Sequence, residues 1–174
     1  MGSFPVLLRL STKWLCVAAL SLLAPIANVL AQSAPEHHAW QDLGAFEPMS
    51  RTAIAITGTI TLSGNPSFAE VGSTMQISFN GGPPINLVSE GASWREWSLN
   101  GGLQTAEVFR LASDPGPLIN GNTICSDTAR YMVFSEANTF GIGNTLQVAA
   151  FDRKKPPFDI NSDGLCGTFS YVVE

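Results

Sequence analysis

The residues that come nearest to a known chemical motif lie close to the C-terminal end of the chain. Asp159, Asn161 and Asp163 place oxygen atoms at alternate positions, and Gly164 follows them. This is the pattern of the first half of a calcium-binding loop, which continues to a bidentate Glu at its twelfth position. That position is Ser170 here. Because the same residue types also form ordinary turns, we expect a turn that is at most a weak calcium site, and no other metal site.

A basic cluster and two tryptophans are the other candidates for contact with a ligand. Arg153, Lys154 and Lys155 stand together on an expected hairpin tip. They could hold a carboxylate or phosphate of a partner, or they could be a solvated turn that blocks edge-to-edge strand pairing. Trp94 and Trp97 could stack against a sugar. Residues three apart on a regular strand point to opposite faces, so we expect one in the core and the other at the surface.

Residues for acid–base or nucleophilic catalysis are scarce. The two histidines, His37 and His38, are adjacent and lie far upstream of the other candidates. No Gly-x-Ser-x-Gly nucleophile motif occurs in the sequence. Two of the 14 Asp and Glu residues could meet across strands to cleave a glycosidic bond, but no spacing singles out a pair. We therefore expect no catalytic residue and no cofactor.

Two of the three cysteines, Cys125 and Cys166, are expected to remain in the exported protein. A thiol nucleophile would need a base, and a zinc site would need three or four ligands. Two buried free thiols are the plain alternative. An oxidising compartment favours a disulfide, and a bridge that closes a loop of about 42 residues would contribute roughly 4 kcal/mol in the chain-entropy account.

Residues 1–31 have the pattern of a secretory signal peptide. Arg9 and Lys13 precede an apolar run at 14–27, and small residues near Ala31 suit a cleavage site. The run is too short for a stable membrane span. Cys16 lies inside it without the small residues that precede a lipoprotein cysteine. We therefore expect a periplasmic or secreted protein with no membrane span and no lipid anchor.

Composition excludes some partners. Cleavage after Ala31 would leave 143 residues with 7 Lys and Arg and 14 Asp and Glu, a formal net charge of −7. A chain of that length can bury one core. Nucleic acid requires clustered positive charge on the protein, so the acidic balance argues against it. An anionic membrane surface is disfavoured for the same reason.

Alternating apolar residues separated by turn residues run through the rest of the chain. After an irregular lead-in at 32–50, the pattern at 52–62 places Ile54, Ile56, Ile60 and Leu62 on one face of a strand. Gly58 interrupts this series, which indicates a bulge or the close approach of a neighbouring side chain. Further strands are expected at 75–79, 85–87, 94–99, 103–112, 131–135, 146–151 and 167–173.

About eight short antiparallel strands and no helical period predict an all-β protein with one disulfide. Such strands form a small up-and-down barrel or a two-sheet sandwich. The expected organisation is a signal peptide at 1–31, a lead-in at 32–50 and a single β domain at 51–174.

The C-terminal pattern resembles that of a group of small secreted proteobacterial proteins. It consists of Ala150-Phe151-Asp152, then Pro156-Pro157, then Leu165-Cys166-Gly167-Thr168-Phe169. The resemblance covers the last fifty residues best. It implies a bacterial envelope origin and no particular activity, because no activity is assigned to the group.

These observations together predict a non-catalytic binding or inhibitor-type module. Its partner would be a protein or a small ligand in the envelope. Two other classes stay open, a hydrolase that uses two carboxylates in a surface groove and a structural component of the envelope. A deep pocket lined by two acids would favour the hydrolase, and an exposed apolar rim would favour partner binding.

Overall fold

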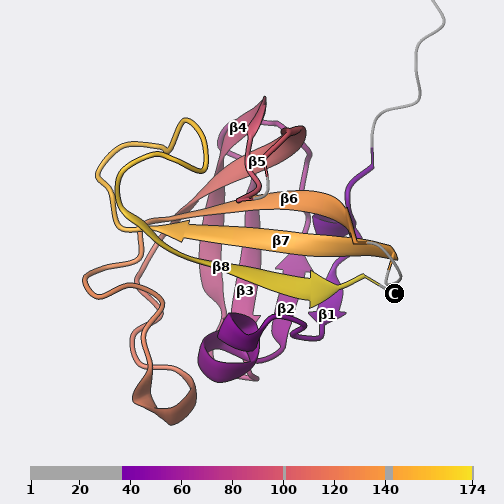
Figure 1. The fold of residues 1–174 in the computed structure, drawn as a ribbon. Coiled ribbons are helices and arrows are strands. Elements are labelled where there is room, and N and C mark those ends of the chain that lie inside the picture. Colours follow the sequence, from indigo (N-terminus) through magenta and orange to yellow (C-terminus); the bar gives the residue numbers. More distant parts are fainter. Residues whose placement is uncertain (1–36, 100, 140–142, 174) are drawn as a thin grey trace, which may run out of the picture. The chain divides into compact units, whose positions relative to one another are not determined.

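The computed structural model describes residues 37–99, 101–139 and 143–173 (Figure 1). The expected signal peptide and Cys16 lie outside the described residues. Residues Pro35–Glu174 form one compact unit. Its elements in chain order are η1 (Ala39–Gln41), β1 (Gly44–Phe46), η2 (Ala53–Thr57), β2 (Ile60–Gly64), β3 (Thr74–Phe79), β4 (Ile85–Glu96), β5 (Leu103–Leu111), η3 (Ile119–Gly121), β6 (Tyr131–Thr139), β7 (Gly143–Phe151) and β8 (Leu165–Val172).

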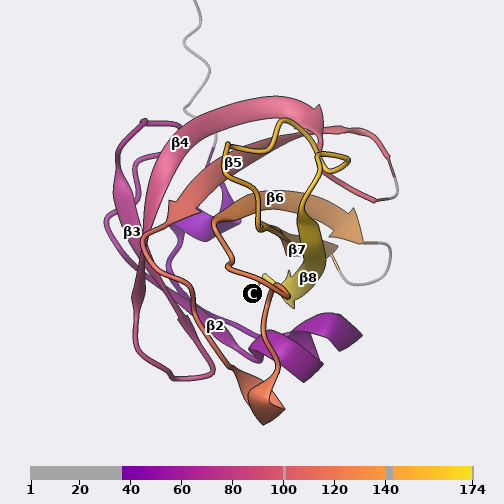
Figure 2. The ribbon, with the colours of Figure 1, turned by 90° about the vertical axis from the view of Figure 1, so that its left-hand side faces the viewer.

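The eight strands form one antiparallel sheet in sequential order, from β1 at one edge to β8 at the other. Figure 2 shows the strands curving around a common interior. The segment that follows β1 reaches the opposite edge of the sheet, where Pro48 and Tyr171 form an isolated antiparallel bridge. Met49 N–H donates to the carbonyl of Ser170, and Val172 N–H donates to that of Glu47. The expectation of an all-β fold with about eight antiparallel strands is confirmed.

The inner face of the sheet carries most of the core. Alternate residues of each strand point inward, as period-two geometry requires, and in β5 these include Phe109 and Leu111. The largest fully buried side chains are Trp40, Tyr171, Phe109, Phe134, Phe151, Phe169, Ile60, Leu62, Met75, Ile77, Leu87 and Met132. All but Phe151 belong to the inner cluster, so protein side chains occupy the interior.

A second, smaller core lies on the outer face of β5, β6 and β7. Val108, Tyr131, Val133 and Phe151 pack there against Ile160 of the long β7–β8 connection. The two ends of this connection are joined, because Asp152 N–H donates to the Gly164 carbonyl. Farther along it, Ile160 N–H donates to the Glu96 carbonyl at the end of β4. The sheet is therefore covered on both faces in this region.

The structure differs from the expected strand at 52–62. Residues Ala53–Thr57 form the π-helical turn η2, and the strand begins only at Ile60. Ile54, expected to point inward, is 56% exposed. The hydroxyl of Thr57 lies 2.7 Å from that of Tyr171 and 3.1 Å from the Ala53 carbonyl. The contact with Tyr171 of β8 and the bond within the turn outweigh a β-propensity that depends on context.

Two further expectations about strands change. The lead-in at 32–50 was predicted to be irregular, yet its described part contains η1 and β1, because Trp40 and Phe46 are buried in the core. The β domain therefore begins before residue 51. The strands expected at 85–87 and 94–99 are one strand, β4, which continues through a register shift between Ser89 and Gly91. A bulge of this kind lets one strand bend without ending.

The predicted disulfide is confirmed. Cys125 and Cys166 are bonded, with their Cα atoms 5.0 Å apart. The bridge joins the connection before β6 to Cys166, the second residue of β8. Cys125 is buried in the inner core. In the part of the chain that the structure describes, no helix is long and apolar enough to cross a membrane.

Candidate functional site

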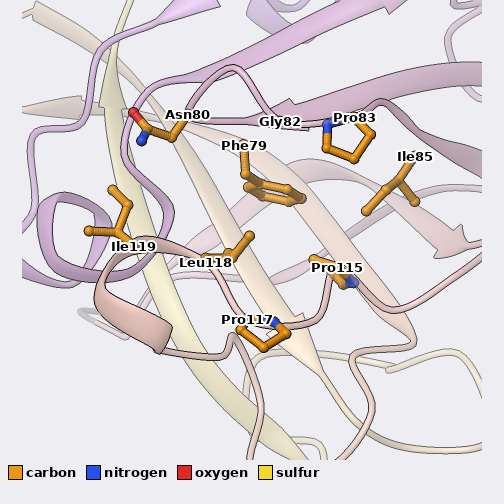
Figure 3. A pocket seen from close by; sticks show the side chains of 9 residues that line it. All are labelled: Phe79, Asn80, Gly82, Pro83, Ile85, Pro115, Pro117, Leu118 and Ile119. Atoms are coloured by element: carbon orange, nitrogen blue, oxygen red, sulfur yellow. The ribbon is translucent and has the colours of Figure 1, made fainter.

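An apolar pocket opens between the β3–β4 hairpin turn and the β5–β6 connection (Figure 3). Its volume is about 260 Å³. In Figure 3 the ring of Phe79 and the side chain of Leu118 lie at its centre, with prolines on both sides. It is lined by Phe79, Asn80, Gly82, Pro83, Ile85, Pro115, Pro117, Leu118 and Ile119.

The hairpin wall is shaped by turn chemistry. Asn80 and Gly81 both have positive φ, at 46° and 73°, which is the conformation that Asn-Gly supplies in tight hairpin turns. Gly82 N–H donates to the Phe79 carbonyl over 2.8 Å, and Asn80 N–H donates to the Thr59 carbonyl over 2.7 Å. The ring of Pro83 fixes the next φ angle. This wall is therefore held in one conformation.

The opposite wall is an irregular segment that is held by its own hydrogen bonds. Asp114 accepts from Gly116 N–H over 3.3 Å and from Ala129 N–H over 2.9 Å. Leu118 N–H donates to the Asn122 carbonyl over 2.6 Å. The Asn122 amide in turn donates to the Ala55 carbonyl over 3.0 Å, which places η3 beside η2 at the same end of the sheet (Figures 1 and 2). Two prolines in this segment limit its freedom further.

Gly58 lies close to one residue of each wall of the pocket. A Cβ atom at this position would lie 2.8 Å from Cδ1 of Ile119 and 3.2 Å from Cβ of Asn80. The sequence indicated either a bulge or a close approach at Gly58, and the structure shows the close approach. The spacing of Ile119 and Asn80 therefore depends on the absence of a side chain at residue 58.

The chemistry of the pocket is that of binding to an apolar group. Asn80 supplies its one polar side chain, and none of its nine lining residues carries a titratable group or a metal ligand. Phe79 and Ile85 are buried, whereas Pro83 and Pro117 are exposed at the rim. Covering such a surface releases water from apolar atoms, which is favourable in proportion to the area covered.

A buried polar cluster lies at another place, inside the sheet. Glu107 is 1% exposed, and its carboxylate accepts from Trp40 Nε1 over 3.0 Å and from Ser89 Oγ over 2.6 Å. Glu136, two positions beyond the partner of Glu107 in β6, accepts from Ala39 N–H and lies 3.8 Å from Nδ1 of His38. The two carboxylates therefore hold the segment around η1.

Sequence reasoning missed this cluster. Glu107 sits in an alternating strand where an inward position is normally apolar, and its partners lie 18 and 67 positions away. His38 is 4% exposed, and its ring stacks on Trp40 with centroids 4.5 Å apart. His37 remains exposed, where it contacts Asp42. The burial of His38 follows from that of Trp40, which its ring covers.

The basic residues of the β7–β8 connection are not equivalent. Arg153 makes an ion pair with Asp163 over 2.9 Å, and its side chain is 20% exposed. Lys154 and Lys155 are exposed. The three residues line an open hollow of about 410 Å³ together with Asp152 and Asp163. Their positive charge is therefore partly balanced by carboxylates, which weakens the case for an anion site.

The two tryptophans take opposite environments, as their spacing predicts. Trp97 is 3% exposed and belongs to the outer core, while Trp94 is 58% exposed. The neighbouring Arg95 stacks its guanidinium over the ring of Phe158, 4.5 Å from the centroid. Trp94 and Trp97 do not face a common surface.

The calcium-like run forms a turn. Asp159 accepts from Asn161 N–H over 3.0 Å, which is the local hydrogen bond of an Asx turn. Asp163 is 89% exposed and is paired with Arg153. Among the residues described, no three His, Cys, Asp or Glu side chains come together in a way that could hold a metal ion.

Comparisons of this chain with protein-family models, with curated proteins and with solved structures found no match.

Proposed function

We propose that this protein is a non-catalytic binding module of the bacterial envelope, and that its apolar pocket receives one aromatic side chain of a partner protein. The observation that carries the proposal is the pocket between the β3–β4 turn and residues 115–119. Its lining is apolar and its two walls are held rigid by hydrogen bonds and prolines. A preformed site loses little conformational entropy on binding.

The volume of the pocket limits the size of the group that can bind in it. Sites for drug-sized molecules are usually about 300–1,000 Å³, and this one is about 260 Å³. It therefore suits a single side chain better than a whole small ligand. Aromatic anchors that fill such pockets contribute much of the energy of protein–protein interfaces, and the Asn80 amide could orient a ring that carries a polar tip.

The interior of the sheet is a less suitable place for a ligand. Trp40, Phe109 and Phe134 pack against one another there, with ring centroids 5.1 Å apart for the two phenylalanines. A molecule that entered would have to displace these side chains. We therefore place the binding site in the apolar pocket and not inside the sheet.

The proposed compartment rests on independent features. The Cys125–Cys166 disulfide is of a kind that persists in oxidising compartments. The signal-peptide pattern at 1–31 and the resemblance of the C-terminal segment point to the periplasm or the exterior of a bacterium. We infer that the protein acts there as a binding module or as an inhibitor of a partner.

The proposal can be tested with an aromatic side-chain analogue, N-acetyl-tryptophan amide, titrated into the ¹⁵N-labelled protein. We expect shifts at Asn80, Gly82, Leu118 and Ile119, with millimolar affinity because one side chain supplies only part of an interface. Pro83→Glu places a charge at the rim and should abolish these shifts. Pro84→Glu is the matched control, since Pro84 is exposed but does not line the pocket.

Two outcomes would contradict the proposal. One is the absence of shifts at these four residues at millimolar analogue. The other is an equal response of the wild-type protein and the Pro83→Glu variant. Melting temperatures measured on the same samples would show that both variants are folded.

A further inference from the structure

A second hollow lies on the outer face of β6, β7 and β8, and its lining is polar. Its volume is about 170 Å³. The floor is a row across three neighbouring strands, because Ser135 pairs with Gln147 and Gln147 pairs with Ser170. Their neighbours Phe134, Val148 and Phe169 belong to the inner core, so these polar side chains point outward. Thr168 extends the floor along β8.

The polar groups of this floor have unused hydrogen-bonding capacity. Within residues 37–99, 101–139 and 143–173, the side chains of Ser135, Gln147, Thr168 and Ser170 make no hydrogen bond to the protein. Ser135 is nevertheless only 2% exposed. Because Ser135 lines the hollow, its hydroxyl can pair with a group that binds there.

The end of β4 and the residues after it form the side wall. Trp97 is held in place by a 3.1 Å hydrogen bond from its Nε1 to Ser93 Oγ. The amide of Gln104, in the orientation that satisfies both ends, accepts from Ser98 N–H over 2.9 Å. Leu99 is 66% exposed at the rim. The hollow thus has an apolar edge over a floor of hydroxyls and one carboxamide.

The lining selects a class of ligand. Hydroxyl and carboxamide groups each donate and accept, and no lining residue carries a charge. A charged ligand would lose its hydration without a counter-charge. An apolar ligand would leave the polar floor unpaired. A neutral molecule that has several hydroxyls and an apolar edge satisfies both the floor and the wall.

We propose that this hollow is a binding site for one pyranose ring of a neutral saccharide. The row of Ser135, Gln147 and Ser170 pairs with neighbouring hydroxyls of the sugar. Trp97 is too buried to serve as a stacking platform, and it shapes the wall against which the ring edge lies. The site is separate from the apolar pocket, since the two share no lining residue.

The test uses methyl β-glucoside and N-acetylglucosamine as neutral ligands, with glucuronate and glucosamine as charged comparisons. Saturation-transfer NMR and calorimetry measure binding to the intact protein. We expect binding of at least one neutral sugar and at least about tenfold weaker binding of both charged sugars. Gln147→Leu should weaken binding by about tenfold or more, because it removes donor and acceptor from the middle of the row.

Ser135→Ala is the second variant, chosen because it removes one hydroxyl with almost no change in volume. Ser78→Ala is its control, since Ser78 is a partly exposed serine of β3 that does not line the hollow. We expect weaker binding only for Ser135→Ala. The proposal is overturned if no neutral sugar binds at 10 mM, a concentration on the order of weak single-ring affinities. It is also overturned if charged sugars bind as well, or if Gln147→Leu binds like the wild type.

Discussion

Trp40 and Glu107 are joined by a hydrogen bond in the interior of the protein. The indole Nε1 lies 3.0 Å from the carboxylate Oε2, and the two side chains are 0% and 1% exposed. Ser89 occupies the other carboxylate oxygen. The bond links the N-terminal segment to the middle of the sheet. It also gives the buried carboxyl group of Glu107 the hydrogen-bond partners that a buried polar group requires.

Trp40→Phe should destabilise the protein, since it removes the N–H donor and leaves the carboxylate with one partner fewer. We expect a loss of about 1–3 kcal/mol in the free energy of unfolding, the usual cost of an unpaired buried polar group. Urea denaturation followed by circular dichroism measures it. Trp94→Phe is the control, because Trp94 is 58% exposed. Equal losses in the two variants would show that the bond to Glu107 contributes nothing.

Removal of the disulfide should lower stability more than a surface change does. Cys125→Ala combined with Cys166→Ala frees a loop that is closed across 41 positions. We expect a loss of about 2–4 kcal/mol, which corresponds to a fall on the order of 10 °C in melting temperature for a domain of this size. Differential scanning calorimetry of the oxidised protein and the double variant gives the comparison. An unchanged melting temperature would contradict a structural role for the bridge.

Tyr171 should make the protein sensitive to alkali. Burial raises the pKa of the Tyr171 phenol well above its ordinary value of 10.0, and the hydrogen bond with Thr57 lowers it only in part. The folded state therefore holds this proton while the unfolded state releases it above pH 10. Stability from this group is complete below pH 10 and is lost as the pH rises beyond it.

The measurement for Tyr171 is the free energy of unfolding between pH 8 and pH 12. Tyr171→Phe should remove part of the alkaline fall, even though it loses the contact with Thr57 and is less stable at pH 8. Tyr131→Phe serves as the comparison, since burial and Glu90 also raise the pKa of Tyr131. If the free energy of unfolding falls with the same slope in Tyr171→Phe and in the wild type, groups other than Tyr171 cause the alkaline loss of stability.

Gly58→Ala should disturb the apolar pocket as well as the fold. The new Cβ would meet Ile119 at 2.8 Å, and φ at this residue is +62°. We expect a loss of about 1–3 kcal/mol, as for a strained backbone position. Gly81→Ala is the control, because φ there is +73° and nothing lies within 4 Å of the new atom. If Gly58→Ala weakens binding of the tryptophan amide and Gly81→Ala does not, residue 58 helps to shape the pocket. If the two variants bind the amide equally well, residue 58 has no such role.

Local patterns predicted much of the sheet. Alternation identified β3, β5, β6, β7 and β8, since this signal arises from residues close in sequence. The disulfide followed from counting the cysteines that an exported chain retains. The opposite environments of Trp94 and Trp97 followed from strand geometry alone.

The remaining features depend on distant partners. The turn η2 replaces an expected strand because Thr57 meets Tyr171, 114 positions away. β1 is only three residues long and carries no alternation long enough to read. The apolar pocket combines a hairpin turn with an irregular proline-containing segment, and no periodicity relates the two. The row Ser135, Gln147, Ser170 becomes visible only when the register of three strands is known.

The contacts between residues 47–50 and β8 can form only after the rest of the sheet has been synthesised. Ser50 Oγ accepts from Ser170 N–H, 120 positions along the chain, so the N-terminal edge of the sheet has no neighbour on that side until the final strand is present. Contacts of such sequence separation form late and slow folding. During synthesis, the first strands would expose an unpaired edge to other chains. Truncation of the last strand should therefore leave a chain that aggregates, and not a smaller stable domain.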